Sequence, residues 1–97
     1  MNIQIIADNL VLSAGNRLLI DEKINNALEK LLTHYSPEQK IASVKVQKDK
    51  YDKYTINFDM NLAGNNIYAQ TSHILFESAL VDLIDAIEKQ IKKLKEN

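Results

Sequence analysis

The sequence predicts an α+β fold with the element order β-α-β-β-β-α, in which two helices pack on one face of a four-stranded sheet. Two patterns carry this prediction. Apolar residues recur at helical spacing from about Ala14 to Thr33 and from roughly Leu75 to Leu94, and apolar and polar residues alternate between positions 41 and 61. The 97 residues, 45% of them hydrophobic, have the size of one compact domain. We therefore expect a single domain over residues 1–97.

The first strand and the first helix are expected in residues 1–33. Residues 1–7 are apolar-rich and precede two turn-forming residues, which favours a short strand. Ser13 can accept a hydrogen bond from the free amides of a helix that begins at Ala14. Apolar residues at spacings of three and four then predict the helix face that packs on the sheet. They are Ile20, Ile24, Ala27, Leu28 and Leu31.

Three further strands follow in residues 41–71. Ser36-Pro37 interrupts the helical pattern, because proline has no amide proton to donate. Ile41 to Lys48 and Tyr54 to Asn61 alternate apolar and polar residues, so each predicts a strand with one buried and one wet face. Ala63-Gly64-Asn65 reads as a tight turn whose last two residues tolerate positive φ, and Asn66 to Thr71 returns as the last strand of a hairpin. These three strands are expected to be antiparallel.

The final helix has the clearest pattern in the chain. At about 100° per residue its apolar residues fall within an arc of about 100°, which predicts one buried stripe. They are Phe76, Leu80, Leu83, Ile84, Ile87, Ile91 and Leu94. Lys89, Lys92 and Lys93 fall on the opposite side, where solvent or a partner meets them. We expect Thr71 or Ser72 to cap the start of this helix.

The charges are segregated along a chain whose net charge is only -1. Strong nucleic-acid binders usually carry a basic excess, so an anion site in this chain has to be local. Residues 40–53 hold five basic and two acidic residues, and residues 86–97 hold four and two. Residues 54–85 hold four acidic residues and no basic one. Two local basic zones therefore stand out.

Both basic zones also have a purely structural interpretation. Lysines near a helix C-terminus interact favourably with the helix dipole, and Asp85–Lys89 and Glu88–Lys92 have the spacing of helical ion pairs. Lysines in residues 45–53 can keep a sheet edge from pairing with other chains. In the functional interpretation, Lys23 and Lys30 extend the terminal zone across two adjacent helices and form the stripe that an RNA backbone needs. The residue pattern alone leaves both interpretations open.

The sequence contains no recognisable catalytic constellation, so we expect no enzyme. The absence of cysteine excludes disulfides and thiolate chemistry, and the two isolated glycines exclude a glycine-rich phosphate loop. Asp82 and Asp85 share a helix face, but an open face offers no pocket to shift their pKa values. Neither histidine has the spacing of a metal site. We expect no metal, no cofactor, no small-molecule substrate and no membrane contact, and a soluble cytoplasmic protein.

The chain resembles the short ribosome hibernation promoting factor and ribosome-associated inhibitor family. The opening Met1-Asn2-Ile3-Gln4-Ile5 is similar to the first strand of that family. Ala79-Leu80, followed by Leu83-Ile84-Asp85 and Ile87-Glu88-Lys89-Gln90-Ile91-Lys92-Lys93, is similar to its closing helix. The hairpin at Gly64 also stands where the family has one. The resemblance therefore covers essentially the whole chain.

The resemblance implies a domain similar to the double-stranded-RNA-binding fold that occupies the decoding channel of the small ribosomal subunit. Such proteins hinder messenger and transfer RNA and hold idle ribosomes inactive in stationary phase or stress, sometimes within ribosome dimers. The implied partners are the small subunit and its rRNA, with a second factor for dimers left open. The residues implied to contact rRNA phosphate are Lys89, Lys92, Lys93 and Lys95, with Arg17, Lys23 and Lys30 on the first helix.

The chain also departs from the family pattern. Asp8 stands where a basic residue is common, and Leu75 and Glu77 stand where aspartate and tyrosine are usual. The extra C-terminal dimerisation domain of long members is absent from this sequence, so we do not expect this chain alone to pair ribosomes. The alternative hypothesis is a protein–protein interaction domain or homodimer without an RNA role. It would use the exposed sheet face and Leu18-Leu19, which fall outside the helical stripe.

Overall fold

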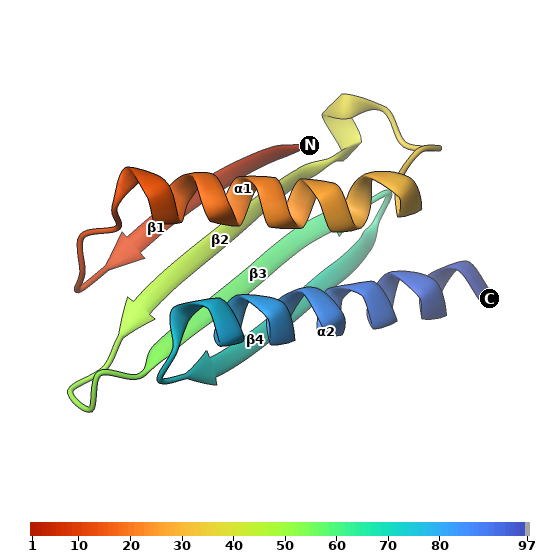
Figure 1. Cartoon of the computed structure of the whole chain (residues 1–97). Helices are drawn as coiled ribbons and strands as arrows, with labels where there is room; N and C mark the ends of the chain where they lie inside the picture. The colour runs from red at the N-terminus through yellow and green to blue at the C-terminus, as the bar shows by residue number, and fades with distance from the viewer. Residues whose placement is uncertain (97) are drawn as a thin grey trace.

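A computed structural model describes residues 1–96 of the chain (Figure 1). The strands are β1 (Asn2–Asp8), β2 (Ile41–Lys48), β3 (Tyr54–Leu62) and β4 (Asn65–His73). The helices are α1 (Ala14–Leu28) and α2 (Phe76–Glu96), and the short 3-10 turns are η1 (Glu29–Leu31) and η2 (Pro37–Gln39). The predicted order β-α-β-β-β-α is confirmed.

The four strands form one mixed sheet in the order β1-β2-β3-β4. β1 pairs with β2 in parallel, and the pairs β2–β3 and β3–β4 are antiparallel, as expected for the three later strands. Both helices lie on the same face of the sheet and run in the same direction, so their C-terminal ends lie at the same end of the molecule (Figure 1). This arrangement brings residues near position 30 and residues near position 92 to one end of the fold.

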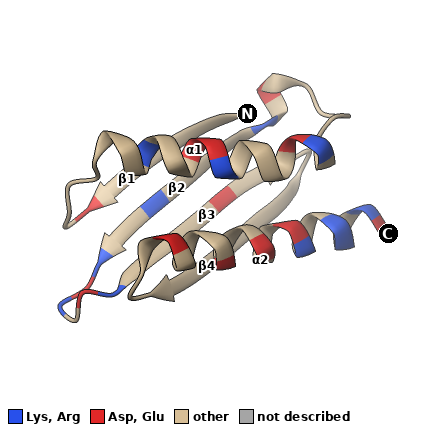
Figure 2. Ribbon diagram, viewed as in Figure 1, with Lys and Arg blue, Asp and Glu red and all other residues tan. Residues whose placement is uncertain are grey.

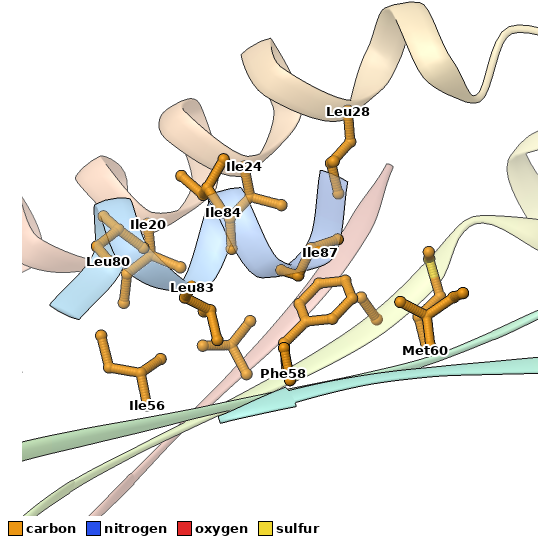
Figure 3. Close-up of a cluster of buried hydrophobic side chains, with 14 of the residues drawn as sticks. Ile20, Ile24, Leu28, Ile56, Phe58, Met60, Leu80, Leu83, Ile84 and Ile87 are labelled. Atoms are coloured by element: carbon orange, nitrogen blue, oxygen red, sulfur yellow. The ribbon is translucent and has the colours of Figure 1, made fainter. Parts of the chain in front are cut away.

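The core lies between the sheet and the helix layer. Strand residues that face the helices are buried, and Val44, Phe58 and Ala69 stand side by side across β2, β3 and β4. Helical residues fill the space above them: Figure 3 shows Ile20, Ile24 and Leu28 of α1 beside Leu80, Leu83, Ile84 and Ile87 of α2. The stripes predicted from periodicity therefore form the helix faces that pack on the sheet.

The first helix ends earlier than its periodicity predicts. The α-helix stops at Leu28, and the tighter 3-10 turn η1 follows it instead of a continuous helix to Thr33. The amide of Leu32 donates to the carbonyl oxygens of both Leu28 and Glu29, at 3.1 and 3.2 Å. This tightening makes Leu32 a fully buried residue, while Leu31, which we expected in the stripe, is only partly buried.

The start of α2 is also built differently from the prediction. Thr71 and Ser72 lie in β4, so neither caps the helix that begins at Phe76. The Thr71 hydroxyl donates to the carbonyl oxygen of Ala79 at 2.7 Å and ties the strand to the helix. The Ser72 hydroxyl shares a hydrogen bond of 2.9 Å with Thr55 across the sheet. β4 therefore runs two residues further than expected, and the side chains of Thr71 and Ser72 both make hydrogen bonds.

The β3–β4 turn contains two residues, Ala63 and Gly64, because Leu62 already pairs with Asn65. Positive φ angles fall on Ala63 (51°) and Gly64 (86°), rather than on Gly64 and Asn65. Two successive positive φ angles are typical of the type I′ turn that matches the strand twist. The side chain of Asn61 accepts a hydrogen bond from the Gly64 amide at 3.0 Å and supports this turn.

Candidate nucleic-acid interface

The terminal lysines, which we define as Lys89, Lys92, Lys93 and Lys95, are all exposed on the last turns of α2. Of these four lysines, only Lys92 has an ion pair with another described residue, with its Nζ 3.9 Å from Oε2 of Glu88. An exposed pair of this length contributes little, about 0–1 kcal/mol, and a phosphate can replace it. The end of α2 therefore presents lysines whose positive charges have almost no carboxylate partner among the described residues.

The terminal lysines do not all project in one direction. Lys93 lines a shallow hollow of about 260 Å³ with Gln90 and Leu94 of α2 and with Asn65 and Asn66 at the start of β4. At 100° per residue, Lys89 and Lys92 lie on the side of α2 that faces away from the sheet. The group therefore wraps around the helix end, from its solvent face to the β4 edge.

Of the first-helix candidates, Lys30 lies at the same end of the molecule as the terminal lysines. It lies in η1, directly after α1 (Figure 2). Lys23 lies further back, in a small hollow between the helices that it shares with Glu77. The two-helix stripe expected from sequence is therefore basic at the C-terminal ends of the helices, and Lys23 has an acidic neighbourhood.

Arg17 lies on a different side of the fold. Its Nη1 atom is 3.5 Å from the carbonyl oxygen of Ile5, to which it donates a weak hydrogen bond. Ile5 belongs to β1, which is one edge strand of the sheet, whereas Lys93 lies beside β4, which is the other edge strand. The structure does not bring Arg17 together with the terminal lysines.

The second basic zone, residues 40–53, is largely neutralised by neighbours. Each of three lysines has a carboxylate oxygen 3.7 Å from its Nζ atom; the pairs are Lys40–Glu29, Lys45–Asp8 and Lys48–Asp52. In the β2–β3 turn, the Asp49 carboxylate accepts the backbone amides of Tyr51 and Lys53 at 2.8 and 3.0 Å. The Lys53 and Tyr51 amides hold the pKa of Asp49 below its ordinary value. These contacts give the zone a structural role, but the expected protection of a sheet edge is wrong, because β2 pairs with β1 on one side and with β3 on the other.

The outer face of α2 is divided by charge along its length, whereas basic and acidic residues alternate along α1 (Figure 2). In the N-terminal half of α2, Glu77, Asp82 and Asp85 are exposed, and none of them has an ion pair within the described part of the chain. The terminal lysines follow in the C-terminal half, as the colours in Figure 2 show. The near-neutral total charge thus hides an acidic half and a basic half of one surface.

One feature of this surface was missed by sequence reasoning. Leu19, expected to contact a loop or a partner, packs partly against the core and lines the hollow between the helices, while Leu18 is 57% exposed. Leu19 and Lys23 are one helical turn apart, and this spacing could have predicted a shared flank toward α2. The acidic half, in contrast, was visible in the sequence, because residues 54–85 hold four acidic residues and no basic one.

The surface has the character of a binding domain for a large partner. The hollows of about 260 to 420 Å³ on the described surface are open and shallow, and the more enclosed one between the helices measures about 90 Å³ and is mainly apolar, with Leu19, Leu80, Val81 and Ile84 in its lining. The volume of this enclosed hollow is below the range of ordinary ligand pockets, about 300 Å³ and more. Neither helix of the described chain offers the long apolar run that a bilayer span requires. The fold and the exposed cations define a small α+β domain suited to a polyanionic surface.

The chain belongs to the family described as sigma 54 modulation protein / S30EA ribosomal protein, whose model matches residues 3–97. Members of this family are non-enzymatic, ribosome-associated factors that modulate translation. The resemblance to hibernation promoting factors is thereby confirmed, as is the expectation that the chain is no enzyme.

Two solved structures share the fold over nearly the whole chain. A ribosomal subunit interface protein from Coxiella burnetii has a TM-score of 0.76 and 22% sequence identity, covering 100% of both chains. The N-terminal domain of Protein Y from Thermus thermophilus has a TM-score of 0.79 and 20% identity, covering 97% of this chain and 99% of its own. A comparison with curated proteins returned no match.

Proposed function

We propose that this protein binds the small ribosomal subunit, occupies its decoding channel and keeps idle ribosomes inactive in stationary phase or stress. It acts by steric occupation, which requires a folded body, a surface for rRNA and no chemical step. The observation that carries the proposal is the family match over residues 3–97 together with terminal lysines that lack strong internal partners. The name of the Coxiella structure, a ribosomal subunit interface protein, supports the same partner.

The proposed contact is electrostatic and confined to one end of the helix layer. Lysines that neutralise rRNA phosphates release condensed counterions, so each phosphate contact lowers the slope of log K against log salt concentration by about 0.7–0.9. Lys30, Lys89, Lys92, Lys93 and Lys95 form the proposed contact set. Lys23 and Arg17 lie outside it, because the first is beside Glu77 and the second is on the β1 edge. A nearly neutral protein can bind in this way, since local charge sets the contact.

The first experiment is a pelleting assay with purified small subunits across a series of salt concentrations. We expect the protein to sediment with the subunits at low salt and to dissociate as salt rises. The fitted slope should correspond to about three to five phosphate contacts. A protein that stays in the supernatant at low salt would refute the proposal. A second readout, inhibition of cell-free translation, tests whether the bound protein hinders messenger and transfer RNA.

A pair of charge-reversal variants tests the assigned residues. Lys89→Glu/Lys93→Glu removes two cations from the contact set, and Lys50→Glu/Lys53→Glu makes the same charge change in the β2–β3 turn. None of these four lysines has an ion pair within residues 1–96. We expect the α2 variant to lose at least tenfold in affinity with a shallower salt slope, and the turn variant to lose much less. Equal losses would refute the assignment to the end of α2.

A further inference from the structure

One surface is left unused by the proposed rRNA contact. It consists of Leu19, Glu77, Val81, Asp82 and Asp85, and we name it the acidic apolar patch. Leu19, Glu77 and Val81 line the hollow between the helices together with Leu80, Ile84 and one cation, Lys23. Glu77, Val81 and Asp82 also line an adjoining, more open hollow with His73 and Ser78. Val81 is 55% exposed and lines both hollows.

We infer that the acidic apolar patch binds a basic polypeptide segment with aliphatic side chains, belonging to a protein of the small subunit that lies beside the rRNA contact. This inference rests on the proposed function, because it assigns a second partner within the same docked state. Unpaired carboxylates repel phosphate, so the N-terminal half of α2 is unsuited to RNA. A protein embedded among phosphates needs lysine and arginine, and it thereby supplies the complementary charge.

The two halves of α2 are far enough apart to bind separate partners. Asp82 and Lys92 are ten residues apart on α2, which corresponds to about 15 Å along the helix axis. The Debye length at physiological ionic strength is about 8 Å. Asp82 and Lys92 are therefore largely screened from each other, whereas Asp85 lies one helical turn from Lys89 and marks the boundary between the two halves. Each half keeps its own charge preference.

The apolar hollow favours a polypeptide over a purely electrostatic partner such as a metal ion or a polyamine. An aliphatic side chain inserted beside Leu19 and Val81 would remove apolar surface from water, at about 25 cal/mol per Å². Lysine or arginine on the same segment would reach Glu77 and Asp82 at the rim. A second copy of this chain also carries lysines, but its terminal lysines would then be covered and unable to bind rRNA.

The decisive experiment compares two targets with one charge-reversed protein. Asp82→Lys/Asp85→Lys is titrated against intact small subunits and against the same rRNA stripped of protein. Both residues are exposed, so the variant should fold normally, which circular dichroism and thermal unfolding check. We expect affinity for stripped rRNA to rise several-fold and affinity for intact subunits to fall about tenfold. This opposite response is not expected if the patch faces RNA or solvent.

A matched variant separates the local effect from the change in net charge. Asp59→Lys/Glu38→Lys adds the same four charge units at exposed sites outside the helix layer, neither of which has an ion pair in the described residues. It should bind both targets more tightly. Val81→Gln, which leaves the charge unchanged, should weaken binding to intact subunits only.

Three results would contradict either the inference or the proposed function. Intact subunits that bind Asp82→Lys/Asp85→Lys as well as or better than the wild type would overturn the inference and leave the proposed function standing. Wild-type protein that fails to bind either target would refute the proposed function itself. A dimer in light scattering that Asp82→Lys/Asp85→Lys dissociates would assign the patch to a second copy and overturn the inference.

Discussion

The side-chain amide of Gln90 binds the backbone of Tyr68 as a neighbouring strand would. The Tyr68 amide donates to Oε1 of Gln90 at 3.2 Å, and Nε2 of Gln90 donates back to the Tyr68 carbonyl oxygen. Tyr68 lies in β4, the edge strand beneath α2, so this contact occupies backbone groups that would otherwise be free to pair with another chain. The same helix that carries the terminal lysines thus protects one edge of the sheet.

Replacing Gln90 with leucine should destabilise the protein by about 1–2 kcal/mol, since two hydrogen bonds are lost and water restores part of their energy. Gln70→Leu on the exposed face of β4 is the matched control and should change stability by less than about 0.5 kcal/mol. Urea unfolding measures both. We also expect Gln90→Leu to aggregate more readily, because the edge of β4 is opened. Equal stability of the two variants would contradict the assigned role of Gln90.

Truncating a core residue of α2 should have a larger effect. Ile87 is completely buried between α2 and the sheet (Figure 3), so Ile87→Ala removes apolar contacts and leaves a cavity. We expect a loss of about 2–4 kcal/mol in the free energy of unfolding. Val81→Ala on the exposed side of the same helix should change stability by less than about 0.5 kcal/mol. A small effect at Ile87 would mean that α2 does not pack as described.

Asp49 should make stability depend on pH. Hydrogen bonds from the Lys53 and Tyr51 amides hold its pKa in the folded state below the ordinary value of 3.8. As pH falls, the unfolded chain takes up the proton first, so the contribution of Asp49 is complete above pH 3.8 and is lost as pH falls through the lower folded pKa.

The comparison of Asp49→Asn with Asp59→Asn tests this linkage, because both remove one carboxylate. Asp49→Asn should lower the thermal unfolding midpoint at pH 7, and its difference from the wild type should shrink at pH values below 3.8. Asp59 lies exposed on β3 and has neither an ion pair nor a side-chain hydrogen bond among the described contacts, so Asp59→Asn should change the midpoint little. A difference for Asp49→Asn that stays constant with pH would refute the linkage.

The β3–β4 turn offers a stabilising substitution. Ala63 has a φ angle of 51°, a conformation that costs an alanine about 1 kcal/mol and that asparagine adopts more readily. Ala63→Asn should therefore raise the free energy of unfolding by about 0.5–1 kcal/mol, and it creates the Asn-Gly pair typical of type I′ turns. Gly64→Ala should have the opposite sign, because its φ angle of 86° strains any side chain, although no atom lies within 4 Å of the added carbon.

The sequence predicted the element order because the spacing of apolar residues within each segment shows which of its positions are buried, and this spacing differs between helices and strands. A helix at 3.6 residues per turn and a strand at two residues per repeat separate buried from wet positions locally, so Ile24, Val44, Phe58 and Leu83 could be assigned to the core without any model. The last turn of the first helix and the start of the second were wrong. There, single contacts at Leu32 and Thr71 decide the backbone path, and neither contact has a periodic signature.

The sequence by itself determined the fold class, the core faces of both helices and the presence of lysines at the end of the chain. Only the tertiary structure decided which cations share a surface: Lys30 lies at the end where α2 finishes, Arg17 lies on the β1 edge, and three lysines of residues 40–53 have carboxylate partners. The physical reason is that burial follows from spacing within one element. Charge complementarity depends on how elements far apart in the sequence pack together, and no local repeat encodes that arrangement.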